Sequence, residues 1–213
     1  MGIVRVSEFT ISLDGFGAGP DQSLENPLGG CGPEMFTWYF HTRTFHEMTG
    51  QEGGSEDIDN QIAVNAMANV GSWILGRNMF GPIRGDWPDH SWKGWGGANP
   101  PYHCPVFVLT HYPRPSIEME GGTTFHFVTD GIESALKQAS QTAGEKDVRI
   151  GGGVATIRQY LKAGSIDEMH FACSPVLMGK GENLFGDIDL HAMGFTCVNR
   201  VATDYATHVF LKR

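Results

Sequence analysis

Apolar runs bounded by turn residues predict a set of strands. The runs 72–76 and 105–110 are continuous, as in strands that a parallel sheet buries on both faces. The first run is rich in β-branched residues and ends at Asp14-Gly15, a pair that is typical of turns. Together these runs place strands at residues 3–15, 72–76, 105–110, 123–128 and 147–150.

Apolar residues at helical spacing predict helices between these strands. Gly144 and Gly164 follow two such stripes, as glycines commonly do where helices end. The aromatic segment 34–46 also has helical spacing, and Ser55 or Asp57 would cap a further helix. The stripes are Met35, Trp38, Tyr39 and Phe45; Ile58, Ile62, Ala66 and Val70; Ile132, Ala135, Leu136 and Ala139; and Val154, Ile157 and Leu161.

The C-terminal part returns to strand patterns. In segment 166–173 the inward set would be Met169, Phe171 and Cys173, and the outward set Glu168 and His170. Residues 194–213 have the pattern of a β-hairpin. Strands that alternate with helices predict parallel pairing through crossovers. We therefore expect one α/β domain over residues 1–213, with a mixed, mostly parallel sheet, helices on both faces and a C-terminal antiparallel hairpin.

Residues 81–105 are irregular and aromatic. They contain Trp87, Trp92, Trp95 and Tyr102 with five prolines, and they show neither a helical nor a strand period. Long irregular segments in compact domains are usually functional or disordered, and this aromatic content favours order. Three roles stay open: core together with a dimer interface, a wall that stacks a planar ring, or a docking surface for a partner.

The charge balance excludes one class of function. The chain has 15 Lys and Arg against 24 Asp and Glu, a formal net charge of −9, whereas a general nucleic-acid binder carries a basic stripe. Neither a signal-peptide pattern nor an apolar run of about 20 residues for a membrane span is found. The cysteines are widely spaced, which favours reduced thiols in a cytoplasmic protein. They are Cys31, Cys104, Cys173 and Cys197.

Three adjacent glycines are the clearest chemical signal. Gly151, Gly152 and Gly153 lie between the strand 147–150 and the helix that begins at Val154. A glycine turn lets a phosphate approach the main chain, and a helix N-terminus offers free N–H groups and a positive dipole end. Tight strand–helix packing is the alternative, because the spacing differs from the G-x-G-x-x-G dinucleotide motif.

Four stretches together resemble a known family. They are "WILGRNMF" (73–80), "PVFVLT" (105–110), "VRIGGGVATIRQYLKAGSIDEMHF" (148–171) and "SPVLMGKGENLF" (174–185). With them the chain resembles dihydrofolate reductase-like proteins, and most of all stand-alone relatives of the reductase domain of bifunctional riboflavin-biosynthesis deaminase/reductases. The resemblance implies a fold of that type, NADPH as the cofactor, an oxidoreductase activity and a homodimer.

The resemblance also implies which residues hold the cofactor. Thr10, Asp14, Phe16 and Ala18 would border the nicotinamide, and the turn after strand 72–76 would hold phosphates. The end of strand 105–110, with an arginine nearby, would lie beside the adenosine 2′-phosphate, and the three glycines would receive the pyrophosphate. The implied cofactor-binding residues are Thr10, Ala18, Gly76, Arg77, Asn78, Met79, Thr110, His111, Thr129, Gly151, Gly152, Gly153, Val154, Ala155 and Thr156.

The catalytic acid has two candidates, Asp14 at the end of the first strand and Glu34 at the start of the aromatic helix. Glu34 lies one residue further from Trp38 than the acid of dihydrofolate reductases does, and one position turns a helical side chain by about 100°. Water is a further possible source of the proton. These observations leave the proton donor open.

The acceptor is defined only by class. Phe16, Trp38 and Trp95 are candidates to stack a small planar acceptor that is pterin-, pyrimidine- or quinone-like. The loop 15–33 has no Lys or Arg to hold a phosphoribosyl group. A non-catalytic nucleotide-binding or interaction protein is the alternative function. The deaminase zinc signature is absent, and His41 and His46 lack the i, i+4 spacing of paired ligands, so we expect no metal.

Overall fold

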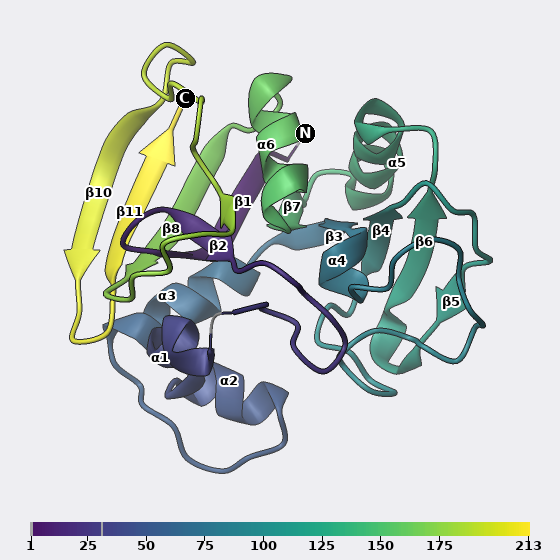
Figure 1. The fold of residues 1–213 in the computed structure, drawn as a ribbon, viewed down its shortest axis with the longest axis horizontal. Helices are drawn as coiled ribbons and strands as arrows, with labels where there is room; N and C mark the ends of the chain where they lie inside the picture. Colours follow the sequence, from purple (N-terminus) through teal and green to yellow (C-terminus); the bar gives the residue numbers. More distant parts are fainter. Residues whose placement is uncertain (1, 31) are drawn as a thin grey trace.

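The computed structural model describes residues 2–30 and 32–213, so the thiol predicted at Cys31 lies outside the described residues. Its central sheet has nine strands in the order β10-β11-β8-β1-β7-β3-β4-β6-β5 (Figure 1). They are β1 (Val4–Ser12), β3 (Val70–Gly76), β4 (Pro105–Leu109), β5 (Ile117–Glu118), β6 (Thr124–Val128), β7 (Asp147–Gly152), β8 (Glu168–Ser174), β10 (Thr196–Ala202) and β11 (Thr207–Lys212). A small second sheet pairs β2 (Phe16–Ala18) with β9 (Glu182–Asn183).

The strand pairing confirms the predicted mixed sheet. Strands β8, β1, β7, β3, β4 and β6 pair in parallel with one another, in that order. The hairpin β10–β11 adds antiparallel strands next to β8, as predicted. At the opposite edge β5 pairs antiparallel with β6, and it is too short for a sequence period to reveal. Because β1, β3, β4 and β7 run in one direction, their carboxyl ends meet at one edge of the sheet.

Helices cover both faces of this sheet, as predicted. In Figure 1, α5 and α6 lie on one side, whereas α1, α2 and α3 lie on the other. The helices are η1 (Pro33–Phe36), α1 (Thr37–Phe40), α2 (Arg43–Met48), α3 (Ile58–Met67), α4 (Arg77–Phe80), η2 (Glu120–Gly122), α5 (Ile132–Ala143) and α6 (Val154–Lys162). Within the described ranges, no helix combines the length and the apolar character that crossing a bilayer requires.

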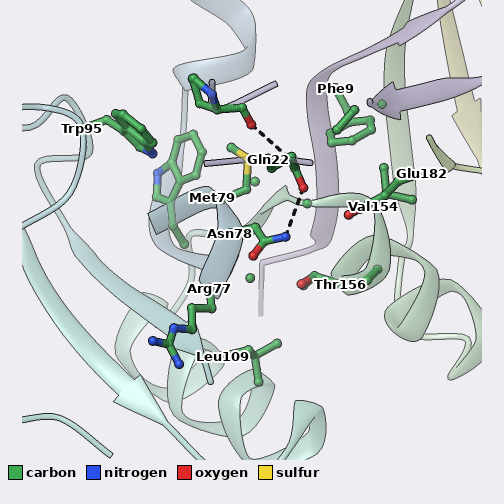
Figure 2. A pocket seen from close by; sticks show the side chains of 18 of the residues that line it. Phe9, Gln22, Arg77, Asn78, Met79, Trp95, Leu109, Val154, Thr156 and Glu182 are labelled. Carbon is green, nitrogen blue, oxygen red and sulfur yellow. Dashed lines mark hydrogen bonds between the residues drawn. The ribbon is translucent and has the colours of Figure 1, made fainter. Parts of the chain in front are cut away.

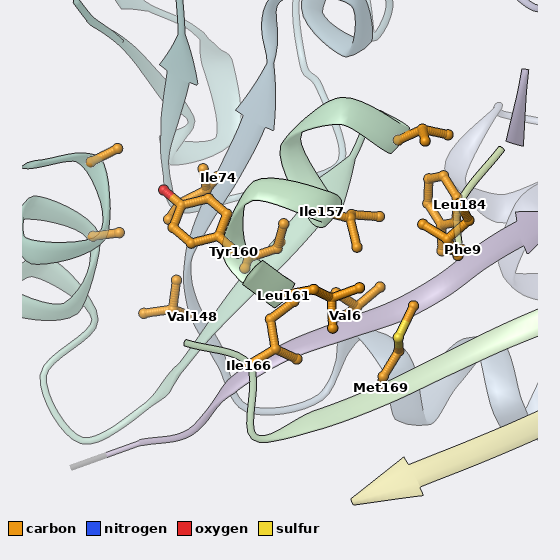
Figure 3. Packing of buried hydrophobic residues seen from close by; sticks show 14 of the residues in the cluster. Val6, Phe9, Ile74, Val148, Ile157, Tyr160, Leu161, Ile166, Met169 and Leu184 are labelled. Atoms are coloured by element: carbon orange, nitrogen blue, oxygen red, sulfur yellow. The ribbon is translucent and has the colours of Figure 1, made fainter. Parts of the chain in front are cut away.

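The predicted apolar stripes of α5 and α6 form the core on one face. Ile157 and Leu161 of α6 are buried against Ile74 and Val148 of the sheet (Figure 3). Tyr160 is buried beside them, and its hydroxyl donates to the Ile132 carbonyl at 2.8 Å. Each buried large apolar side chain contributes roughly 1.5–3 kcal/mol to folding, so this layer fixes where α6 begins relative to β7.

The aromatic segment 81–105 covers the opposite face of β3, β4 and β6. Trp87 and Trp92 pack against the buried side chains on that face. Their indole N–H groups donate to the carbonyls of Tyr112 at 3.0 Å and Phe80 at 2.8 Å. Of the roles left open for this segment, a part in the core is confirmed for these two tryptophans.

Two helix predictions are wrong in detail. The segment 34–46 is not one helix: the chain turns at Thr42, which bridges to Ser55 and whose side chain caps α2. Val70 belongs to β3 rather than to the preceding helix. Asn69, which takes a φ of 58°, separates the two elements. Tertiary pairing overrides the local apolar period at both places.

The predicted outward position of His170 is also wrong. Its side chain is buried, and its ring stacks on Phe210 of β11 at 4.5 Å between centroids. The ring of Trp38 contacts it edge-on at 6.4 Å. Strand β8 has neighbours on both sides and α1 above this face, so its polar positions are covered as well as its apolar ones.

Candidate active site

A cavity of about 940 Å³ lies at the carboxyl ends of β1, β3, β4 and β7. Glycines and polar side chains line one part, which we call the polar half. Aromatic side chains line the other part, which we call the aromatic half. The polar half comprises Gly76, Arg77, Asn78, Met79, Thr110, His111, Thr129, Gly151, Gly153, Val154, Ala155 and Thr156, and the aromatic half Glu8, Thr10, Phe36, Trp38, Tyr39, Phe40, Trp73, Tyr102 and Arg149.

Arg77 is the main cation of the polar half. Figure 2 shows it on one turn with Asn78 and Met79, across the cavity from Val154 and Thr156. The guanidinium lies over the Trp87 ring, 3.9 Å from its centroid, and burial lowers its pKa from the usual value. Its Nε and Nη2 atoms are buried without a hydrogen-bond partner. Buried polar groups are normally satisfied, so these two donors fit an anionic ligand.

The beginning of α6 offers main-chain donors to the same half. Gly153 is the N-cap residue and provides no side-chain cap. In the described part of the chain, no acceptor is found for the amides of Val154 and Ala155, whereas those of Thr156 and Ile157 donate to the Gly153 carbonyl. Free amides at the positive end of a helix dipole are suited to a phosphate.

The three glycines serve packing as well as access. A Cβ on Gly151 would lie 2.6 Å from Leu75 and 2.8 Å from Trp73, so this glycine is required by the protein's own packing. Gly152 has a φ of 121°, which L side chains rarely adopt, and it is not among the lining residues. Only Gly153 is nearly open, with its nearest neighbour 3.9 Å from an added Cβ. Tight packing therefore explains Gly151, and the approach of a phosphate to the main chain stays a prediction at Gly153.

The ends of β4 and β6 complete the polar half. Thr110, His111 and Thr129 all line the cavity, as predicted. The Thr110 hydroxyl already accepts from the Tyr112 amide at 3.2 Å. Arg114 does not line the cavity: its guanidinium donates to two carbonyls of segment 81–105, so it holds that segment in place.

Two polar residues of this half were missed by the sequence analysis. The Arg84 guanidinium donates to Asn78 at 2.7 Å, and the Asn78 amide donates to Gln22 at 3.2 Å. Gln22 belongs to the loop after β2, so the contact brings that loop to the mouth of the cavity (Figure 2). A cation and an amide in Gly- and Pro-rich loops carry no periodic signal, and only the folded chain brings them together.

The aromatic half contains part of the predicted acceptor site. Trp38 and Thr10 both line it, and the Trp38 indole N–H donates to the Thr10 hydroxyl at 2.9 Å. Trp95 lines the cavity and is 45% exposed, as an entrance residue would be. Ala18 also lines the cavity, whereas Phe16 does not, because β2 pairs it with Asn183 of β9.

Neither predicted catalytic acid lines the cavity. The Asp14 carboxylate accepts from the Ser12 hydroxyl at 2.6 Å and from the amides of Met178 and Gly179 at 3.1 and 2.7 Å. These bonds lower its pKa to about 2, so it is a loop anchor without a proton to donate at neutral pH. Glu34 is exposed in η1, outside the lining. Both residues are therefore poorly placed for catalysis.

The acid that does line the cavity is Glu8, paired with Arg149. The guanidinium Nη2 lies 2.6 Å from Glu8 Oε2, and the two side chains are only 5% and 8% exposed, for Arg149 and Glu8 respectively. Burial raises the pKa of Glu8, and Arg149 partly opposes that shift. The signal was present in the sequence, because a Glu and an Arg inside two strands of buried type have to pair with each other. Neither residue was predicted as part of the site.

A histidine–carboxylate cluster lies outside this cavity. His41, Asp57 and Asp59 bring potential metal-ligand atoms within 4.8 Å of one another. Asp57 also caps α3 by accepting from the Asn60 amide at 3.2 Å, as one of the two expected caps. These groups already bond one another or the helix, and the expectation of no metal stays a prediction.

Comparisons with known proteins agree with this geometry. The family model of the RibD C-terminal domain matches residues 5–208. A putative riboflavin biosynthesis protein from Shewanella sp. PV-4 has a similar structure, with a TM-score of 0.58 and 21% identity over 100% of this chain and 98% of that one. RibD from Acinetobacter baumannii gives a TM-score of 0.56 and 17% identity, over 100% of this chain and 58% of that one. None of the curated proteins matches.

A third structure shows the same relation. The diaminohydroxyphosphoribosylaminopyrimidine deaminase/5-amino-6-(5-phosphoribosylamino)uracil reductase from Thermotoga maritima gives a TM-score of 0.54 and 16% identity, over 99% of this chain and 56% of that one. At these identities the structures establish the fold, and the family model covers most of the sequence. The chain therefore belongs to the RibD C-terminal domain family, as the resemblance carried by its four motifs predicted.

Proposed function

We propose that this protein transfers a hydride from NADPH to a small planar acceptor bound in the aromatic half of the cavity. The observation that carries the proposal is the continuity of the cavity. The same space of about 940 Å³ is lined by the free donors of Arg77 and α6 and by the aromatic residues around β1. A cofactor in the polar half would therefore reach an acceptor in the aromatic half.

The chain's own residues suit NADPH in the polar half. The amides of Val154 and Ala155 would bind the pyrophosphate, and Gly153 lets it approach. Arg77 would contribute its two unpaired donors to a phosphate, with Thr110 and His111 close to the 2′-phosphate. When bound, NADPH supplies the hydride. Thr10 and Ala18, which both line the cavity, would border the nicotinamide.

The aromatic half would orient the acceptor and exclude water from it. Tyr39, Trp73 and Tyr102 present flat apolar surfaces to the cavity, and Trp95 lies at its exposed side. Planar rings are held well by such walls, through offset or edge contacts. Water exclusion strengthens the polar contacts that remain inside. A small pterin-, pyrimidine- or quinone-like ring fits this description.

Two measurements test the proposal. Titration with NADPH and NADH, followed by tryptophan fluorescence, should show saturable binding that favours NADPH. NADPH oxidation should then be followed with pterins, flavins and quinones as acceptors. Absence of saturable NADPH binding would reject the function. Binding without oxidation of any acceptor would favour the alternative, a nucleotide-binding protein that catalyses nothing.

We also propose that the protein is a cytoplasmic homodimer, as the resemblance implies. The edge strand β10 supports this, because most of its residues are exposed and Val198 is 59% exposed. An unpaired strand edge of this kind is commonly covered by a partner. Light scattering of the purified protein should give twice the chain mass of 23.3 kDa, and cell fractionation tests the location.

A further inference from the structure

The position of Glu8 is set by an irregularity in β1. The pairing of β1 with β8 shifts register between Val6 and Phe9. Glu8 lies inside this interval with a φ of 57°, in the left-handed region that few non-glycine residues adopt. Bulges of this type re-aim a side chain, and they are over-represented next to active sites. Here the bulge occurs at Glu8, whose carboxylate lines the cavity and does not point into solvent.

A hydrogen-bonded chain behind Glu8 holds this conformation. The Glu8 amide can only donate, so His170 Nδ1, at 3.1 Å, is its acceptor and carries no proton. His170 Nε2–H then donates to His208 Nδ1 at 3.0 Å. His208 Nε2–H donates in turn to Asp59 at 2.9 Å. One tautomer of each neutral ring therefore satisfies the whole chain, from β1 to α3.

Arg149 is fixed just as firmly opposite the carboxylate. Its Nη2 donates to the Ser7 carbonyl at 2.9 Å and its Nη1 to the Ala66 carbonyl at 3.0 Å. Its guanidinium lies 4.1 Å from the centroid of the Trp73 ring. The pair nevertheless leaves one acceptor, Glu8 Oε1, and one donor, Arg149 Nε, buried without a partner. Buried polar groups are normally satisfied, so these two atoms would be stabilised by a ligand that pairs with them.

We propose that Glu8 is the residue that recognises the acceptor, its free oxygen taking a hydrogen bond from an N–H group on the edge of a planar heterocycle. The inference rests on the proposed function and narrows its acceptor class. A cyclic amide or amidine presents such a donor, whereas a quinone presents only oxygen acceptors to the carboxylate and leaves it unpaired. Glu8 is then a specificity-determining residue, and Arg149 and His170 are positioning residues.

The chemistry of Glu8→Gln makes the test sharp. Arg149 requires an oxygen at the position of Oε2, so the glutamine must place its NH2 group at the free position. The variant thus turns the free acceptor into a donor at nearly constant volume. Hydrogen bonds to charged groups are worth about 1.5–3 kcal/mol, which corresponds to roughly a 10- to 150-fold loss in affinity.

The probe is isocytosine, a neutral planar ring with adjacent N–H donors, and its N-methylated analogue 2-dimethylamino-3-methylpyrimidin-4-one, which has none. Binding of each to the NADP⁺-saturated protein is measured by ligand-observed NMR. Glu34→Gln is the matched control, because Glu34 is an exposed glutamate outside the cavity. We expect wild type and Glu34→Gln to prefer isocytosine, and Glu8→Gln to lose that preference while it keeps its NADPH affinity.

The outcomes separate the two proposals. If the wild type binds NADPH but not isocytosine, or if Glu8→Gln binds isocytosine as well as the wild type does, the role of Glu8 is overturned. If no variant binds NADPH, the reductase function fails, whatever the probes do. Should Glu8→Gln not fold, the double variant Glu8→Gln/Arg149→Met removes both charges together. It should bind NADP⁺ and not discriminate between the probes.

Discussion

Acidification should destabilise this protein through its buried histidine pair. His170 and His208 are 6% and 0% exposed and are neutral in the hydrogen-bonded chain that ends at Asp59. Burial lowers the pKa of His170 to about 3, aided by the neighbouring His208 and Arg149, and burial also lowers the pKa of His208. A proton on His170 Nδ1 would face the N–H of Glu8, so two donors would meet and the hydrogen bond would be lost. The geometry therefore also favours the neutral form of His170.

The size of the effect follows from linkage. An unfolded histidine titrates near pH 6.5, and folded His170 only near pH 3. Between these values the unfolded state holds a proton that the folded state lacks, so the free energy of unfolding falls as the pH falls. The slope is at most about 1.4 kcal/mol per pH unit for one site, and from about pH 7 to about pH 5 His170 alone accounts for about 2 kcal/mol. His208 acts in the same direction.

Urea unfolding followed by tryptophan fluorescence at both pH values measures this loss. His170→Gln should be less stable than the wild type at pH 7 but should lose about 2 kcal/mol less between pH 7 and pH 5. The control is His191→Gln, which removes an exposed histidine and should leave the wild-type pH dependence unchanged. Asp14 and Asp187, with pKa values of about 2, lose their contribution only at lower pH. An unchanged pH dependence in His170→Gln would refute the reasoning.

Three further variants test the cavity. Arg77→Met should weaken NADPH binding roughly 10- to 150-fold, because it removes the charge-assisted hydrogen bonds that Arg77 would make, worth about 1.5–3 kcal/mol. Fluorescence titration measures this, and equal affinities would contradict it. Gly152→Ala, at a φ of 121° and with its Cβ 3.0 Å from Phe9, should lower the free energy of unfolding by about 1–3 kcal/mol, measured by urea unfolding. Trp38→Phe removes the donor to the Thr10 hydroxyl and should slow acceptor reduction at unchanged NADPH affinity, so a weakened NADPH affinity would argue against its place in the aromatic half.

Local patterns were sufficient for most of the fold. The patterns predicted β4 from its continuous apolar run and α6 from the spacing of Ile157 and Leu161. Both patterns involve residues close together in the sequence, so they can be recognised without knowledge of the fold. Most of the residues that the family motifs marked as cofactor-binding line the cavity, and their role in binding stays a prediction. The motifs did not separate Gly151, which packs against Trp73 and Leu75, from Gly153, which is open.

Local patterns could not locate Glu8, the acid that lines the cavity. Asp14 and Glu34 were chosen for their place along the chain, whereas Glu8 reaches the cavity through a bulge that depends on the pairing of β1 with β8. His170 was placed outward for a similar reason, because the alternation in its strand does not show that α1 covers the face on which His170 lies. Register and coverage depend on segments far apart in the sequence, and no local period contains them.

The register between β1 and β7 also determines how the two halves of the cavity are placed relative to each other. Strand β7 carries Arg149 toward the aromatic half and ends in the glycines that precede α6 in the polar half. Its neighbour β1 carries Glu8 and, two residues later, Thr10, and both line the aromatic half. A one-residue slip of either strand would send the side chains of that strand to the opposite face of the sheet. In the proposed function, the pairing of Val6 with Ile150 would therefore position hydride donor and acceptor together, although neither residue lines the cavity.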